Sequence, residues 1–120
     1  MSTKMEISTA ESETASTLQH HLAAVAGGNL DDILSDYGDQ SALITPDRTY
    51  RGLDELRAFF AEMTEKLPTD WMTKVTVIRQ EISTEVAYLF WKAPPFFPLA
   101  TDTFVIRNGK ILTQTFALLA

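Results

Sequence analysis

The order of its periodic segments is the feature that most constrains how this chain can fold. Apolar residues recur at helical spacing in three stretches of the first half, and after Trp71 the pattern changes to the period of two that is typical of β-strands. Breaks at residues 83–85, at residues 94–98 and at Asn108-Gly109 divide this second part into four antiparallel strands. The order predicts an α+β protein in which three N-terminal helices pack on a strongly curved antiparallel sheet, forming a cone with an interior pocket.

Each expected helix has a start or stop signal in the sequence. Gly27-Gly28 follows the first apolar stripe and is a natural helix end, Asn29 is placed to cap the second helix, and Pro68 stops the third. A short strand, a turn at Pro46-Asp47 and a return strand connect the second helix to the third. The expected ranges are residues 14–26, 29–38 and 52–67 for the helices, and 41–45 and 49–51 for the two short strands.

Residues 1–13 are small, polar and acidic, and we expect a flexible arm there, followed by a single domain at residues 14–120. This arm lacks the apolar run of a signal peptide, and no later segment has the length of a membrane span. The chain contains no cysteine, so it has neither disulfides nor a zinc–thiolate site. These features predict a cytoplasmic protein that does not associate with membranes.

Charge and motifs exclude several classes of function. The net charge is −6, and no stretch concentrates Lys or Arg, so nucleic acid is not an expected partner. The sequence has no metal-ligand cluster, no phosphate-binding glycine loop and no nucleophile elbow. We therefore expect no metal and no cofactor, and chemistry would come from carboxylates, imidazoles and hydroxyls.

The strand expected at residues 86–92 is apolar on both faces. Helices that cover only one face of the sheet would leave one of these two rows in water, and a second subunit could cover it. The pattern predicts a homodimer that forms through the sheet. The two rows are Val86, Tyr88 and Phe90 on one face and Ala87, Leu89 and Trp91 on the other.

Two segments of the chain resemble a known superfamily. They are HLAAVAGGNLDDILSDYGDQSALITPDRTYRGLDELRAFF, residues 21–60, and DTFVIRNGKILTQT, residues 102–115. Both are similar to the nuclear transport factor 2-like superfamily, particularly to its SnoaL-like and ketosteroid-isomerase-like members. The resemblance implies the cone-shaped, cystatin-like fold. It does not imply one reaction, because the superfamily includes isomerases, cyclases, dehydratases and non-enzymatic association modules.

The resemblance implies roles for two candidate catalytic residues. Asp102 stands where the ketosteroid isomerases have an acid that donates a hydrogen bond to an oxyanion, and alternation along the strand places it on the face of Phe104. A buried acid of this kind stays protonated and can donate a hydrogen bond, as the resemblance to the ketosteroid isomerases implies. His21 aligns with the family's second donor, a tyrosine, and it lies on the apolar stripe of the first helix.

Each of these residues also has a purely structural interpretation. Asp102 could end its strand in water or bond to Thr115 across the hairpin, and His21 could be a core histidine that bonds a backbone carbonyl. The family's general base is missing: Thr45 stands at the position of that aspartate, and a hydroxyl is a very weak base. Asp47, two residues later, is expected to point to solvent from its turn.

The sequence therefore leaves two hypotheses open. One is a cofactor-free isomerase, cyclase or dehydratase that uses His21 and Asp102 on a small, mostly apolar molecule. The other is a non-catalytic ligand-binding or association module. In either case the side chains expected to line the pocket are those of Tyr37, Thr45, Tyr50, Phe60, Met63, Trp91 and Phe116.

Overall fold

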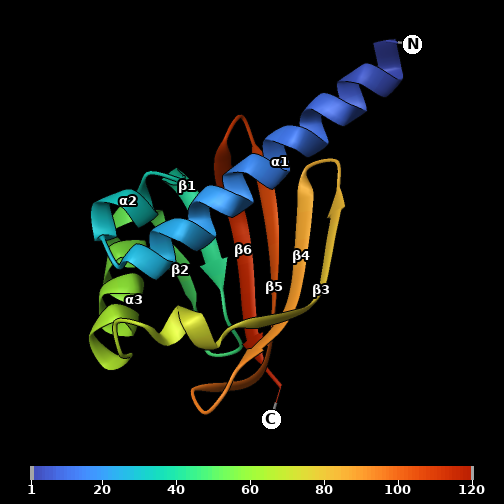
Figure 1. Ribbon diagram of the computed structural model, residues 1–120. Helices are drawn as coiled ribbons and strands as arrows, with labels where there is room; N and C mark the ends of the chain where they lie inside the picture. Colours follow the sequence, from blue (N-terminus) through green and yellow to red (C-terminus); the bar gives the residue numbers. More distant parts are fainter. Residues whose placement is uncertain (1, 120) are drawn as a thin grey trace.

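The computed structural model describes the backbone of residues 2–119 and the side chains of residues 9–119. Helical segments precede the main strands, as expected (Figure 1). The helices are α1 (Ser2–Gly27), α2 (Leu30–Leu34) and α3 (Gly52–Lys66), followed by a 3-10 turn, η1 (Trp71–Lys74). The strands are β1 (Tyr37–Ile44), β2 (Thr49–Arg51), β3 (Thr76–Ser83), β4 (Val86–Ala93), β5 (Phe97–Arg107) and β6 (Lys110–Leu118). The expected α+β class, with three helices packed on one curved sheet, is confirmed.

The six strands form one mixed sheet in the order β2-β1-β6-β5-β4-β3. Strands β3 to β6 are joined by hairpins and pair antiparallel, as the alternating pattern predicted. Strand β1, however, pairs parallel with β6, so the expectation of an entirely antiparallel sheet is wrong at this position. The parallel pairing is possible because a long connection, which includes α3 and four strands, separates β1 from β6.

Helix α1 begins at Ser2, twelve residues before the expected start at Thr14, so residues 2–13 are helical. The flexibility expected of this segment stays a prediction. Met1 lies outside the described residues. Two contacts tie this part of the helix to the β3–β4 turn: the Thr14 hydroxyl donates to the carbonyl oxygen of Thr84 at 2.6 Å, and the Glu11 carboxylate accepts from the Thr84 amide at 3.4 Å. The sequence did not reveal the longer helix because residues 2–13 have no apolar stripe.

Helix α2 is shorter than predicted. Its Asn29 cap is confirmed, since the side-chain oxygen accepts a hydrogen bond from the amide of Asp32 at 3.0 Å. The helix ends at Leu34, and Tyr37 begins β1 instead of ending the helix. Backbone pairing explains this change, because the amide of Ile111 on β6 donates to the carbonyl oxygen of Asp36 at 2.7 Å and draws the chain into the sheet.

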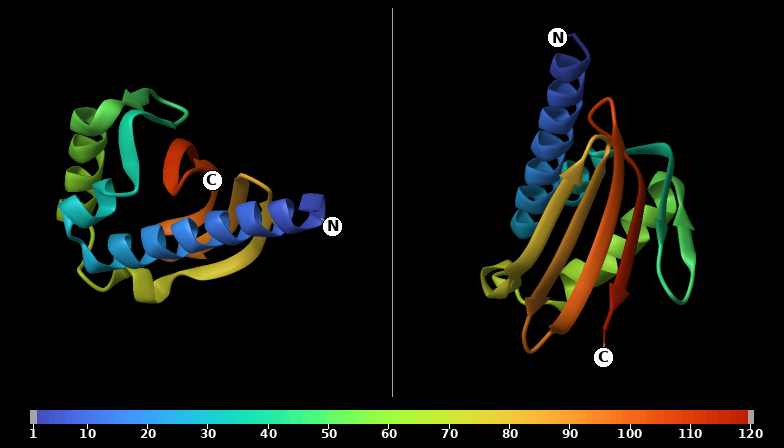
Figure 2. Two further views of the ribbon diagram at one scale, coloured as in Figure 1. Left: turned by 90° about the horizontal axis from the view of Figure 1, so that it is seen from above. Right: turned by 90° about the vertical axis from the view of Figure 1, so that its right-hand side faces the viewer.

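The helices lie on the concave side of the sheet, and α1 passes in front of β5 and β6 and over the β3–β4 turn (Figure 1). The right-hand view of Figure 2 looks onto the outer face of β3 to β6, which no helix covers. The core therefore lies between the sheet and the helices. Its fully buried side chains include Leu18 of α1, Ile33 of α2, Leu56 of α3 and, from the sheet, Leu43, Phe104, Ile106 and Ile111.

Within residues 2–119, no helix is both long and apolar enough to cross a membrane. The cytoplasmic location stays a prediction.

Candidate functional site

A cavity of about 300 Å³ lies between the concave face of the sheet and the helices, a size at the lower end of the range for small-molecule sites. Most of its wall is aromatic or aliphatic, and its polar side chains are few. The apolar wall consists of Leu22, Val25, Tyr50, Phe59, Phe60, Met63, Trp71, Met72, Val75, Val77, Leu89, Trp91, Phe97 and Phe116. The polar side chains are His21, Asp102, Gln114, Glu62 and Lys66.

His21 reaches the cavity from α1, where helical periodicity places it beside buried apolar residues. Its side chain is 4% exposed, and its ring makes edge contacts with the rings of Tyr37, Phe60 and Phe104 at centroid distances of 5.9, 6.2 and 5.3 Å. Burial lowers the pKa of His21 to about 4, and the charge of His20 acts in the same direction. His21 is therefore a neutral imidazole at pH 7, and its Nδ1 atom is buried without a hydrogen-bond partner.

Asp102 reaches the cavity from β5 and points inward, as the alternation predicted. The side chain is 7% exposed, and its Oδ2 atom accepts a hydrogen bond from Trp91 Nε1 at 3.0 Å. Burial raises the pKa of Asp102 to about 7, although Trp91 and Gln114 both favour the carboxylate. Oδ1 is buried without a good hydrogen bond. The alternatives of a solvated strand end and of a bond to Thr115 do not hold.

His21 and Asp102 line the same cavity, but they are not bonded to each other. In the part of the chain with described side chains, no hydrogen bond or ion pair joins them. The two orphaned atoms, His21 Nδ1 and Asp102 Oδ1, are the buried side-chain polar atoms without a partner in residues 9–119. Buried polar groups in native proteins are nearly always paired, so two exceptions in one cavity wall indicate a place for a polar ligand group or water.

A second polar pair joins Gln114 in the cavity wall to Tyr37 behind it. The buried hydroxyl of Tyr37 donates a short hydrogen bond to Oε1 of Gln114, which joins the start of β1 to β6. Burial holds the pKa of Tyr37 well above its usual range, and the nearby charges of Asp102 and Asp36 raise it further. The hydroxyl therefore keeps its proton. Period-two spacing from Phe116 was the sequence signal that could have placed Gln114 in the cavity.

Five of the seven side chains predicted to line the pocket do so: Tyr50, Phe60, Met63, Trp91 and Phe116. Tyr37 is behind the wall, and Thr45 lies in the β1–β2 turn. The Thr45 hydroxyl donates to the carbonyl oxygen of Arg48 at 2.9 Å, and it accepts from the amide of Asp47. Asp47 is exposed, as expected. Neither residue is positioned to act as a base in the cavity.

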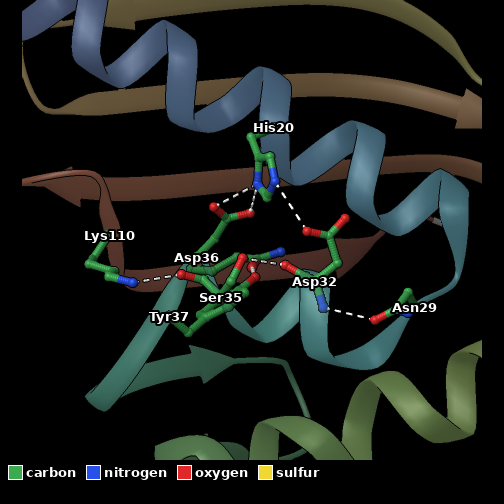
Figure 3. Close-up of polar contacts among 8 residues, drawn as sticks. His20, Asn29, Asp32, Ser35, Asp36, Tyr37 and Lys110 are labelled. Carbon is green, nitrogen blue, oxygen red and sulfur yellow. Dashed lines mark hydrogen bonds and ion pairs between the residues drawn. The ribbon is translucent and has the colours of Figure 1, made fainter.

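A cluster that the sequence did not reveal lies outside the cavity (Figure 3). The Nδ1 atom of His20 lies 2.8 Å from both carboxylate oxygens of Asp36, and its Nε2 atom lies 3.3 Å from Asp32 Oδ1. The hydrogen bond and charge of Asp36 raise the pKa of His20 above its usual value. Lys110 donates to the carbonyl oxygen of Ser35 at 2.6 Å beside it. Residues 9–119 hold no group of His, Asp or Glu that could bind a metal ion.

Comparison with solved structures identifies the architecture. A SnoaL-like protein of unknown function from Burkholderia thailandensis is 16% identical and has a TM-score of 0.74; the match covers 91% of this chain and 96% of that one. The fold is that of the nuclear transport factor 2-like proteins. A protein of this type and of unknown function from Burkholderia xenovorans is 20% identical, with a TM-score of 0.70 and coverage of 92% and 87%.

A candidate ketosteroid isomerase from Kribbella flavida is also similar in structure to this chain. It is 12% identical, has a TM-score of 0.68, and the match covers 91% of this chain and 79% of that one. No family model matches the sequence, and no curated protein matches it. At these identities the likeness establishes the fold, and any activity must be argued from the cavity.

A first prediction follows from the hydrogen bond that Trp91 donates to Asp102. Trp91→Phe removes the donor that favours the Asp102 carboxylate, so the pKa of Asp102 should rise above about 7. A carbon-detected NMR titration of the Asp102 carboxyl group measures this change. Trp71→Phe is the matched control, because Trp71 also lines the cavity and makes no hydrogen bond to Asp102. An unchanged pKa in Trp91→Phe would contradict the prediction.

The His20 cluster makes a second prediction, on stability. Because the folded state has the higher His20 pKa, the stabilisation by this pair is fully present below the unfolded pKa of about 6.5, and it is lost as the pH rises through the folded value. His20→Gln should therefore lower the free energy of unfolding more at pH 6 than at pH 9, as urea denaturation measures.

The control for this experiment is Arg57→Gln. It breaks the 2.7 Å ion pair with Asp31 on α2, the helix that also carries Asp32 of the His20 cluster. Arginine stays charged throughout this pH range, so its loss should have the same effect at both pH values. An equal effect of His20→Gln at pH 6 and pH 9 would contradict the assignment.

Proposed function

We propose that this protein binds a small, mostly apolar molecule with a carbonyl or hydroxyl group in its cavity and acts on it as a cofactor-free isomerase, cyclase or dehydratase. The observation that carries the proposal is the pair of orphaned polar atoms, His21 Nδ1 and Asp102 Oδ1, in an otherwise apolar wall. An apolar cavity with a few convergent polar groups is the usual form of a small-molecule site.

Asp102 is the proposed proton-transfer group. A pKa of about 7 leaves the acid and the carboxylate about equally populated at neutral pH, which suits a group that must both accept and return a proton. As a carboxylate it could take a proton from a carbon next to the ligand carbonyl, and as an acid it could return that proton to another carbon or to a leaving hydroxyl. One residue would thus supply the base that Thr45 cannot.

His21 is proposed to bind the ligand oxygen. Its low pKa keeps the imidazole neutral, so it can donate one hydrogen bond without adding a positive charge to the apolar cavity. The rings of Tyr37, Phe60 and Phe104 hold the imidazole on three sides. In this proposal Asp102 transfers the proton, whereas the sequence resemblance implied that Asp102 and His21 both donate hydrogen bonds to an oxyanion.

The second candidate is a non-catalytic ligand-binding or association module. The specific observation in its favour is Thr45, whose hydroxyl is occupied in a turn at the position of the base in ketosteroid isomerases. Among the described cavity residues, the other carboxylate is that of Glu62, and it is paired with Lys66 at 2.7 Å. On this alternative, the cavity would bind its ligand and leave it unchanged.

A titration with 2-naphthol, a phenolic mimic of an enolate, tests the proposal. The native protein should bind it saturably and shift its fluorescence toward the phenolate, because the Asp102 carboxylate would take the phenol proton and His21 would donate a hydrogen bond to the resulting oxyanion. Asp102→Asn and His21→Ala should each weaken binding, on the order of tenfold for one lost hydrogen bond in a buried site.

The control for the naphthol titration is Asp47→Asn, which alters an exposed turn aspartate outside the cavity. It should leave naphthol binding unchanged. Binding that neither cavity substitution weakens would favour the non-catalytic module, and an absence of binding would count against both uses of the cavity for aromatic ligands.

We also propose that two copies pair through the outer face of the sheet. That face carries Val86, which is 39% exposed, together with Tyr88 and Phe90, which are half-buried. The opposite row, Ala87, Leu89 and Trp91, is buried under the helices. A partner would remove this second apolar row from water.

Light scattering at micromolar concentration should therefore give the mass of a dimer, and Val86→Lys should give that of a monomer. The matched control is Glu65→Gln on the exposed side of α3, which changes the net charge by the same amount and should leave the dimer intact. A native protein that scatters as a monomer would contradict the proposed pairing.

A further inference from the structure

The direction of the Gln114 amide is fixed by its neighbour. The hydroxyl of Tyr37 is buried and keeps its proton, and it donates this proton to Gln114 Oε1. Reversing the amide would turn its N–H₂ group toward the hydroxyl and leave the tyrosine proton without this acceptor, which is costly in a buried site. Gln114 Nε2 must therefore point away from Tyr37.

The sheet register shows what lies on the other side of the amide. Gln114 is opposite Phe104, and Phe116 is opposite Asp102, so Gln114 and Asp102 are diagonal neighbours on the concave face. Both line the cavity, and Gln114 is one of the groups that favour the Asp102 carboxylate. The Nε2 protons are thus directed into the cavity wall beside Asp102.

We propose that Gln114 is a ligand-binding residue that selects molecules with a hydrogen-bond-accepting oxygen, and that Tyr37 is the positioning residue that aims its amide. This inference rests on the proposed use of the cavity for a small molecule, and it narrows the ligand class to ketones, enones and similar carbonyl compounds with an apolar body. Nothing in the sequence resemblance assigns a role to either residue.

The chemistry of the wall explains the preference. A carbonyl oxygen beside Asp102 can accept from Gln114 Nε2, whereas a hydrocarbon of the same shape offers no acceptor and leaves the amide with Asp102 alone. One net hydrogen bond corresponds to a preference of roughly fivefold to tenfold. The apolar remainder of the ligand lies against aromatic rings in either case, with those of Trp91, Phe97 and Phe116 close together at centroid distances of 5.2 to 6.4 Å.

Two probes of nearly equal shape separate this effect from general apolar binding: 2-acetylnaphthalene, which has a carbonyl acceptor, and 2-isopropylnaphthalene, which has none. Binding can be followed by intrinsic fluorescence, because both tryptophans of the chain, Trp71 and Trp91, line the cavity. The native protein should bind the ketone roughly fivefold to tenfold more tightly than the hydrocarbon.

Substitutions then test each residue. Gln114→Met keeps the length of the side chain and should abolish the preference by weakening ketone binding alone. Tyr37→Phe should reduce the preference in part, and the double variant should be no worse than Gln114→Met, because Tyr37 acts through Gln114. Thr115→Val, on the next position of β6, is the control and should bind both probes as the native protein does.

The outcomes distinguish this inference from the proposed function. A preference that survives Gln114→Met, or an equal weakening of both probes, overturns the role of Gln114 and leaves the cavity as a ligand site. Additive effects in the double variant overturn the positioning role of Tyr37. If the native protein binds neither probe, the proposed function fails, and the selectivity assigned to Gln114 fails with it.

Discussion

The curvature of the sheet is the constraint on which the rest of this structure depends. Register irregularities interrupt the pairing of β3 with β4, of β4 with β5, of β5 with β6 and of β6 with β1. Bulges of this kind bend and twist a sheet. A flat sheet under α1 and α3 would bring the helices onto its side chains along their whole length. The bent sheet leaves a cavity between its concave face and the helices, and His21 and Asp102 both line that cavity.

Burying Asp102 in this cavity lowers the stability of the folded protein. Between the ordinary pKa of 3.8 and the value of about 7 in the fold, the folded state of Asp102 binds more protons than the unfolded state does, so stability falls as the pH rises through this range. The difference corresponds to roughly 4 kcal/mol above pH 7, a large part of the stability of a small domain. A chain selected for stability alone would place an apolar side chain at this position. The retained carboxyl group is an argument for a function in the cavity.

The sequence predicted the fold and the inward direction of His21 and Asp102, because both follow from local periodicity and from a recognisable order of elements. It did not predict the partners of these residues. Trp91 reaches Asp102 through the pairing of β4 with β5, and Tyr37 reaches Gln114 across 77 residues of chain. Such contacts depend on strand order and register. The expectation that Tyr37 ends a helix was wrong for the same reason, since its strand forms only when β6 is beside it.

The two adjacent histidines of α1 give the cavity a link to the protein surface. His20 is bonded to Asp36, and the next residue on each segment forms the inner contact between the rings of His21 and Tyr37. The ion pair between His20 and Asp36 therefore holds together the two backbone segments that carry His21 and Tyr37. Weakening this ion pair would let the start of β1 move away from α1 and would shift Tyr37, which lies behind the cavity wall. Through the titration of His20, solvent pH would then affect the geometry of the cavity, although His21 itself stays neutral.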